Sequence, residues 1–354
     1  MKGRIWIGLA LIVLLAAIIF WGFQRSGSRD DGKRGDVLAL MPSDAGAVLY
    51  ADFMELRQAP FIAALYAWAP KPQVDADYAQ FLQATGFNYE RDLDRAAVAL
   101  LKKAPEVSFF AVADGRFDRK QIAAYALQSG TRTTLNGREV FSVPVNGGAR
   151  KISFTFLRND QIALANESDL SKLLTGNQTG ADALDWRTRF ERLAGSPVFA
   201  VLRQDAGAGN ALAEQAPSGL RSPQLSALLD QLPWITLAGK PDGDRLRVVT
   251  EGECTADATA RQLSDLLNGL LVLAQAGLND SKTRKQLDPA VREAYLDLVK
   301  GAEVTRIDRG ETKAVRLVFD VTSKFLEAAR TTAPLAPPAP ATDTAPRRDA
   351  LQKK

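Results

Sequence analysis

Residues 96–129, AAVALLKKAPEVSFFAVADGRFDRKQIAAYALQS, contain two apolar runs followed by a capped helix. The runs at 96–101 and 107–114 have the length and composition of buried strands. Asp114-Gly115 is a turn signal, and Asp118 with Gln121 three positions later forms a capping box for a helix over 119–129. The succession of strand, strand and helix predicts an α+β fold.

Similar patterns extend the prediction in both directions along the chain. Strands are expected at 46–53, 138–145, 151–157, 161–166, 197–203, 234–240, 245–254, 303–308 and 313–321. Helices are expected at 54–70 with an interruption near Pro60, at 167–176, 185–194, 222–231 and 255–277, at 281–300 with an interruption at Pro289, and at 323–330. A loop is expected through TGFNYERDLDR, residues 85–95.

The order of these elements repeats along the chain. Both halves can be written as strand, helix, strand, strand, helix and further strands, although residue identity between them is weak. This predicts two related β-α-β-β-α-β-like halves, similar to a split β-α-β arrangement occurring twice, with a mainly antiparallel sheet. The two halves could share one continuous sheet.

A run of nineteen uncharged residues, IWIGLALIVLLAAIIFWGF, occupies positions 5–23. As a helix it would span roughly 28 Å, close to the roughly 30 Å hydrocarbon core of a bilayer. A cleaved signal peptide, the alternative, would have a shorter apolar region and small residues where this chain has bulky ones. We therefore expect an uncleaved single-pass signal-anchor, a transmembrane helix. The membrane-interface residues predicted at its ends are Lys2, Arg4, Trp6, Trp21, Phe23 and Arg25.

The segments around the anchor complete the expected organisation. It comprises a stub at 1–4, the transmembrane helix at 5–23, a juxtamembrane linker at 24–36, one α+β half at 37–180, a second at 181–330, and a disordered tail at 331–354 with five prolines. Positive charges flank both ends of the anchor, so the charge rule hardly decides its orientation. Because a short stub is easily retained inside, we expect the main domain on the non-cytoplasmic side of a bacterial inner membrane.

The net charge of +4 does not indicate nucleic-acid binding. The excess of Lys and Arg lies in residues 1–34 and in the tail, and the remainder of the chain is slightly acidic. A nucleic-acid interface needs a clustered basic face. The expected partners are instead the lipid bilayer, through residues 5–23, and an envelope protein of unknown identity.

The chain has no histidine, which excludes Ser-His and Cys-His nucleophilic pairs and every His-ligated metal site. Cys254 is the single cysteine, so no intrachain disulfide forms. Because Glu251 and Glu253 are close to it in sequence, we expect a small buried side chain rather than a reactive thiol. No cofactor is expected.

The sharpest candidate for a metal or acid site is NYERDLDR at 88–95. Its acids Glu90, Asp92 and Asp94 could hold a hard cation. However, Arg91 and Arg95 are interleaved with them, and no calcium-loop pattern is completed. A charged loop leading into the strand at 96–101 is the favoured interpretation.

The stretch LALMPSDAGAVLYADFMEL, residues 38–56, resembles the start of the exported domain in an uncharacterised family of bacterial single-pass, membrane-anchored envelope proteins. The matching features are Met41-Pro42-Ser43-Asp44-Ala45, followed by a strand that carries Tyr50 and Asp52. FLQATGFNYERDLDRAAVALL, residues 81–101, is a further similar segment. The resemblance implies a duplicated α+β exported domain and an envelope location, and it supplies no catalytic residues.

The favoured function is therefore a non-catalytic interaction or structural module of the envelope. One alternative is a histidine-free hydrolase that uses pairs of carboxylates, which requires acids that converge in a cleft. Another is a binder of an apolar envelope ligand, which requires a large apolar cavity between helices and sheet. An interaction module requires an exposed apolar patch.

Overall fold

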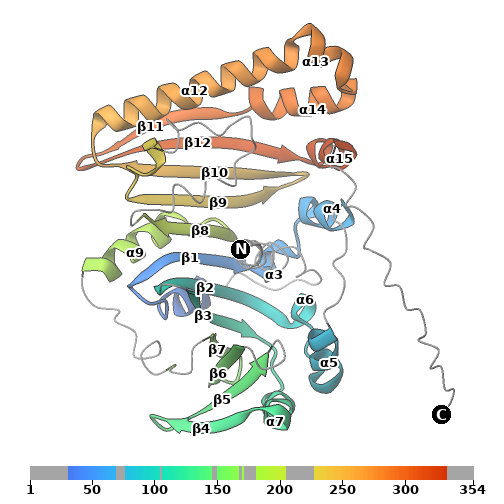
Figure 1. Cartoon of the computed structure of the whole chain (residues 1–354), viewed down its shortest axis with the longest axis vertical. Coiled ribbons are helices and arrows are strands. Elements are labelled where there is room, and N and C mark those ends of the chain that lie inside the picture. The colour runs from blue at the N-terminus through green and yellow to red at the C-terminus, as the bar shows by residue number, and fades with distance from the viewer. Residues whose placement is uncertain are drawn as a thin grey trace, which may run out of the picture.

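The structure is a computed structural model that describes residues 31–68, 76–103, 106–145, 150–166, 170, 181–204 and 227–332. These residues form one sheet of twelve strands with helices on both faces (Figure 1). The α+β class and the mainly antiparallel sheet are confirmed. The strands are β1 (Ala45–Asp52), β2 (Leu93–Lys103), β3 (Glu106–Gly115), β4 (Thr131–Leu135), β5 (Arg138–Val145), β6 (Arg150–Arg158), β7 (Gln161–Ala165), β8 (Val198–Arg203), β9 (Trp234–Asp242), β10 (Arg245–Cys254), β11 (Glu303–Arg309) and β12 (Thr312–Thr322).

The strands follow the order β11-β12-β10-β9-β8-β1-β2-β3-β7-β6-β5-β4. The strands of the second chain half therefore occupy one end of this order and those of the first half the other end. The pair β1–β8 joins them, with Leu49 opposite Ala200. In each half, three consecutive strands are neighbours, and the last strand of the half returns beside the third: β7 beside β3, and β12 beside β10. The sheet is therefore continuous across the two halves.

Every neighbouring pair among the described strands is antiparallel, so the parallel crossover of a split β-α-β unit is not formed. The reason lies in the chain between β1 and β2. Asp52 at the end of β1 pairs with Arg95 near the start of β2. The intervening helices thus return the chain at the same end of the sheet instead of crossing it.

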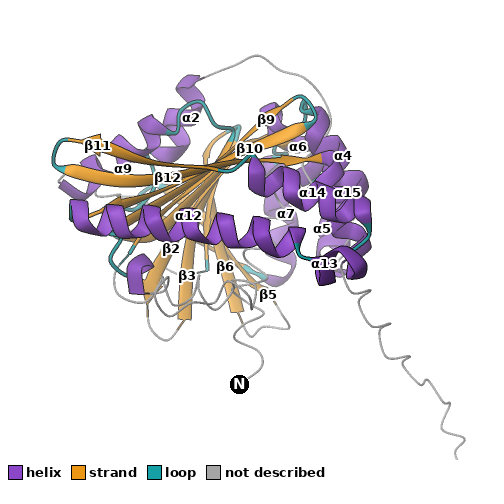
Figure 2. Ribbon diagram, turned by 90° about the horizontal axis from the view of Figure 1, so that it is seen from above, coloured by secondary structure: helices purple, strands orange, loops and turns teal. Residues whose placement is uncertain are grey.

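The helices cover the two faces unequally (Figure 2). One face carries α2 and α9, and the other carries α4, α5, α7, α12, α14 and α15, as the core contacts show. The helices are α2 (Asp31–Leu38), α3 (Phe53–Leu56), α4 (Pro60–Trp68), α5 (Ala76–Thr85), α6 (Tyr89–Asp92), α7 (Arg119–Ser129), α9 (Ala181–Arg192), α12 (Asp257–Asn279), α13 (Ser281–Gln286), α14 (Pro289–Lys300) and α15 (Ser323–Thr332).

Helix α2 occupies residues that the sequence assigns to a linker. Its last turn buries Val37 and Leu38 against small residues of β2, including Ala97. The Arg34 guanidinium lies 4.9 Å from the ring centre of Tyr50 and 5.1 Å from that of Phe199. Ordered structure thus begins no later than Asp31, because apolar burial and cation–π contacts hold this turn on the sheet.

Strand β4 was not expected, and neither were α5 and α6. The loop predicted at 85–95 is wrong in part: the Asn88 side chain caps the short helix α6, and β2 begins at Leu93. Residues 131–135, TRTTL, have no alternating apolar positions, and four of the five are exposed because β4 is an edge strand. The turn after it follows its sequence signal: Asn136 and Gly137 have φ of 49° and 77° and close a two-residue hairpin to β5. Within the described ranges, no helix has the length and apolar character to cross a bilayer. The predicted anchor at 5–23 lies outside those ranges, as do most of the helices expected at 167–176 and 222–231 and the tail from 333 onward.

Candidate functional site

An apolar cavity of about 400 Å³ lies between the first half of the sheet and helices α5 and α7. Its volume falls within the range of small-molecule sites, roughly 300–1,000 Å³. The residues that line it carry no charged, hydroxyl or amide side chain. They are Ala51, Phe53, Phe81, Phe87, Leu93, Ala96, Val98, Phe109, Ala111, Ala113, Phe117, Ile122, Ile152, Phe154, Ile162 and Leu164.

The floor of the cavity is hollow because alanines occupy its centre. Ala96 on β2 faces Ala113 on β3, and Ala111 lies two positions along β3 on the same face. In a strand, alternate residues point to the same face, so these positions put three methyl groups where larger side chains would fill the space. Phe109 and Ile152 extend the same face toward the far end of the strands.

Aromatic rings form the opposite wall. Phe87 stacks on Phe117 with ring centres 5.2 Å apart, and Phe81 meets Phe87 edge-on at 6.1 Å. Phe81 also contacts Tyr125 of α7 edge-on at 5.5 Å, which ties the two covering helices together. Such pairs prefer offset or edge-to-face geometry, so the wall has a defined shape rather than a loose one.

A side-chain cap in the sequence defines where α7, one of the helices that cover the cavity, begins. Asp118 caps α7 by accepting hydrogen bonds from the backbone N–H groups of Lys120 and Gln121, each at 3.0 Å. Gln121 Nε2 donates to the Asp118 carboxylate at 3.1 Å, a side-chain contact that takes the place of the reciprocal backbone bond of the predicted capping box. The cap fixes the start of α7, so Ile122 faces the cavity and is 4% exposed.

The open side of the cavity lies away from α7. Val98, Phe109, Ile152 and Leu164 are half-buried, whereas Leu93, Ile122 and Ile162 are buried. An apolar chain could therefore enter over the half-buried floor and end against the buried wall. Because the lining offers no titratable group, this cavity suits binding by apolar contact and not acid–base chemistry.

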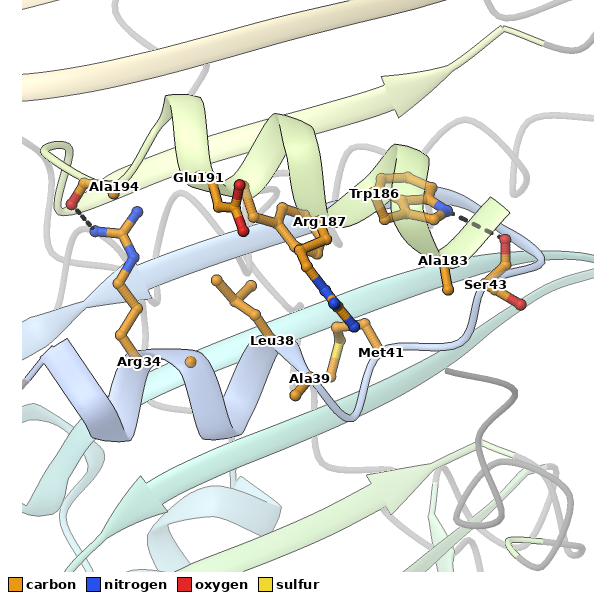
Figure 3. A pocket seen from close by; sticks show the side chains of 12 residues that line it. Arg34, Leu38, Ala39, Met41, Ser43, Ala183, Trp186, Arg187, Glu191 and Ala194 are labelled. Atoms are coloured by element: carbon orange, nitrogen blue, oxygen red, sulfur yellow. Dashed lines mark hydrogen bonds between the residues drawn. The ribbon is translucent and has the colours of Figure 1, made fainter. Parts of the chain in front are cut away.

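A second depression, of about 490 Å³, lies between α2 and α9 (Figure 3). Trp186 of α9 donates from Nε1 to the Ser43 carbonyl at 3.1 Å, and Arg34 binds the carbonyls of Leu193 and Ala194 after α9. Figure 3 shows the side chains of Arg187 and Glu191 between the two helices. These contacts explain how α2 and α9 are held together, and nothing in them selects a particular ligand.

The acids of residues 88–95 do not form a joint site. Asp92 is buried; it accepts two hydrogen bonds from the Arg91 guanidinium, at 2.9 and 2.7 Å, and one from the Asn88 backbone N–H at 3.0 Å. Burial favours a higher pKa for Asp92, but the Arg91 and Asn88 bonds outweigh it and lower the pKa. Asp94 lies 3.7 Å from Arg57. In the part of the chain that the structure describes, no three His, Cys, Asp or Glu side chains are grouped to hold a metal, and Glu90 stays only a weak candidate.

Cys254 is buried in an apolar cluster with Leu232 and Val315, as its sequence context predicts, and burial raises its thiol pKa. Glu251 and Glu253, its sequence neighbours, point to the other face of the sheet. The membrane-interface residues predicted around the anchor, Lys2, Arg4, Trp6, Trp21, Phe23 and Arg25, lie outside the described residues.

The sequence analysis did not identify the residues that line this cavity. The usable signal is the pair of alanines at alternate positions of β3, Ala111 and Ala113, with Ala96 of β2 opposite them, since core strands normally carry larger residues there. What the sequence does not provide is the placement of α5 and α7 over them.

No protein-family model matches the chain, and a search of curated proteins finds no match. Among solved structures, crystal forms IV, I and III of TP0453 are similar, with TM-scores of 0.43, 0.41 and 0.43 and sequence identities of 13%, 11% and 13%. The matches cover 86–87% of this chain and 99–100% of TP0453. Similarity at this level does not define a shared function.

Proposed function

We propose that this protein binds an apolar ligand with a flexible hydrocarbon chain, such as a fatty acid or the acyl chain of a lipid, in the cavity under α5 and α7. The observation that carries the proposal is an exclusively apolar lining around about 400 Å³ of space. A well-packed core has few voids larger than a water molecule, so a cavity of this size is not ordinary packing. Apolar cavities exclude water and accept apolar guests.

The strength of binding depends on how many methylene groups the cavity buries. Each methylene transferred from water contributes roughly 0.8 kcal/mol, so ten would give roughly 8 kcal/mol. The loss of translational and rotational freedom on association opposes this by roughly 4 kcal/mol or more. For ten methylenes the remainder is at most about 4 kcal/mol, a dissociation constant of about 1 mM or weaker, and each further methylene that the cavity accepts tightens binding by roughly 0.8 kcal/mol.

The proposal includes a location. Residues 5–23 would anchor the chain in a bacterial inner membrane, with the α+β domain on the non-cytoplasmic side, as the apolar run and its aromatic flanks favour. A ligand taken from a bilayer would then reach the cavity over a short distance. The matching strand order of the two halves also suggests an internal duplication, in which only the first half developed this cavity.

A second candidate is the interaction module, and α12 supports it. Its first half buries Leu263 (3% exposed), but Val272 and Leu273 near its end are 64% and 68% exposed. Exposed apolar residues that are adjacent on a helix are typical of contact surfaces. Val272→Glu should then prevent co-purification of an envelope protein and leave ligand occupancy unchanged; unchanged co-purification would argue against this role for α12.

The test of the first proposal is native mass spectrometry of the full chain, released from detergent in the gas phase after incubation with palmitic acid. Wild type should carry one palmitate. Ala111→Phe should reduce its occupancy at least about tenfold, since the added ring fills the cavity floor. Ala124→Phe, on the exposed side of α7, is the matched control and should bind as wild type does. Equal occupancy in wild type and Ala111→Phe would refute the cavity as the site.

A further inference from the structure

The second half of the sheet contains a group of ionised side chains on the face that carries α9. Glu251 and Glu253 of β10 are 6% and 3% exposed. Glu253 is bound by Arg189 and Arg192 of α9. Glu251 accepts from Arg192 at 3.4 Å, from Arg309 of β11 at 2.6 and 2.9 Å, and from Arg316 of β12 at 3.3 and 3.1 Å. Arg189 also contacts the Asp185 carboxylate of α9 at 3.4 Å, so four arginines surround three carboxylates, of which those of Glu251 and Glu253 are buried.

The charges in this cluster do not cancel. Burial alone would raise the pKa of Glu251, but the bonds from Arg309 and Arg316 lower it, so the carboxylate stays ionised. Arginine stays protonated at any physiological pH. Four guanidinium groups against the carboxylates of Glu251, Glu253 and Asp185 leave the cluster with an excess of positive charge.

The N–H donors of this cluster also outnumber its acceptor sites. The Glu251 carboxylate already accepts five N–H bonds, and a carboxylate offers about four lone-pair sites, so it is saturated. Each guanidinium has five N–H donors. Arg192, Arg309 and Arg316 each make two hydrogen bonds to the glutamates and none to any other described residue. Each of these three guanidinium groups therefore keeps N–H donors that no described residue accepts from.

These unused donors border a depression of about 370 Å³. The three arginines Arg192, Arg309 and Arg316 line it, and so does Glu251, whose carboxylate is already saturated by their bonds. Ser196 and Thr236 also line it, and their hydroxyls can donate further hydrogen bonds. The arginine side chains are 25%, 28% and 41% exposed, so a solute can reach them, while their bonds to Glu251 hold the guanidinium groups in place. The depression is therefore accessible, positively charged and preorganised.

We propose that this depression is a binding site for a phosphate group. A guanidinium donates charge-assisted hydrogen bonds to phosphate oxygens, and three guanidinium groups with N–H donors to spare around one depression suit a small, multiply charged oxyanion better than a single carboxylate. Glu251 acts as a positioning residue: it holds Arg309 and Arg316 toward the site and does not itself bind the anion. The site lies on a different half of the sheet from the apolar cavity and does not depend on a ligand there.

The test is isothermal titration of the full chain in a non-ionic detergent with inorganic phosphate at low ionic strength. Wild type should bind one phosphate saturably. Arg316→Gln should weaken binding at least about tenfold, as expected for the loss of charge-assisted hydrogen bonds. Arg247→Gln is the matched control: it removes the same charge from an exposed arginine of the neighbouring surface, bound to Asp320, and should leave binding within about twofold of wild type, the size of a screened surface effect.

Two further arms identify the source of the phosphate. Tighter binding of glycerol 3-phosphate than of inorganic phosphate would indicate a soluble phosphomonoester. Binding to phosphatidic acid vesicles that is lost in Arg316→Gln would indicate a lipid headgroup. Either result supports the site. Arg316→Lys keeps the charge without the fork and should recover binding only in part. No saturable binding of phosphate, or equal loss in Arg316→Gln and Arg247→Gln, would overturn the proposal.

Discussion

Enlarging one alanine in the cavity should stabilise the protein, and this is the reverse of what most core substitutions do. Ala96 of β2 lines the cavity and is half-buried. In Ala96→Leu the added carbon atoms would enter existing empty space without displacing a neighbour. In a well-packed core the same change forces side chains and backbone to move and costs about 1–3 kcal/mol.

The expected magnitude follows from the group that is added. Leucine has three more carbons than alanine, and their burial contributes roughly 2.4 kcal/mol at roughly 0.8 kcal/mol per group. Ordering the longer side chain costs about 0.5–1 kcal/mol. Ala96→Leu should thus raise the free energy of unfolding by about 1.5 kcal/mol.

The adjacent residue provides the control. Ala97 points to the other face of the same strand, has no exposed surface and packs in the core cluster under α2. Ala97→Leu adds the same atoms to a filled site and should lower the free energy of unfolding by about 1–3 kcal/mol. Two neighbouring, chemically identical substitutions are therefore expected to have opposite signs.

The assay is urea unfolding of the full chain in one detergent, followed by tryptophan fluorescence, with the midpoint and slope fitted for both variants. Equal destabilisation by Ala96→Leu and Ala97→Leu would refute the reasoning, because it would mean that the space beside Ala96 is filled in solution.

Three further predictions concern the fold. Tyr50→Phe should leave the free energy of unfolding unchanged or raise it by about 1 kcal/mol, because within the described residues the buried Tyr50 hydroxyl has no hydrogen-bond partner. A loss above about 2 kcal/mol, measured by urea unfolding, would indicate that this hydroxyl has a partner such as bound water. Asp118→Ala should cost about 1 kcal/mol by removing the α7 cap, while Asp118→Asn should cost less, and equal losses would contradict a capping role. Burial raises the pKa of Asp114, so its contribution to stability is full below the unfolded pKa and is lost as pH rises through the folded pKa. Asp114→Asn should therefore be more stable than wild type at pH 7 and equal to it at pH 3 in thermal unfolding; the same difference at both pH values would show that the Asp114 carboxyl does not titrate differently on folding.

Much of the fold could be predicted because its signals are local. The helix over 119–129 matches α7, since one side-chain cap and one turn define its start. The strand over 245–254 matches β10, because Gly243, with φ of 61°, closes the turn before it. Elements whose evidence is tertiary were missed. Strand β4 has no apolar face, and α2 is a polar helix that is held on the sheet by Arg34 and by the apolar residues of its last turn.

The candidate sites follow the same division. The alanines at 96, 111 and 113 are visible in the sequence, but a cavity exists only because α5 and α7 cover them without filling the space. Arg192 of the phosphate site lies more than one hundred residues before Arg309 and Arg316, which are on the consecutive strands β11 and β12. Antiparallel pairing brings Arg316 opposite Glu251, and α9 adds Arg192. No local sequence pattern therefore predicts the cluster.

The most direct test of the apolar-ligand account is the position at which a photoreactive ligand labels the protein. Palmitate that carries a diazirine on its chain would be cross-linked to the full chain in lipid nanodiscs, and the labelled peptides would be sequenced by mass spectrometry. The account predicts labels in β2, β3 and α7, at or beside Val98, Phe109 and Ile122, and their loss in Ala111→Phe but not in Ala124→Phe. Labels confined to residues 5–23, or to the depression between α2 and α9, would contradict it.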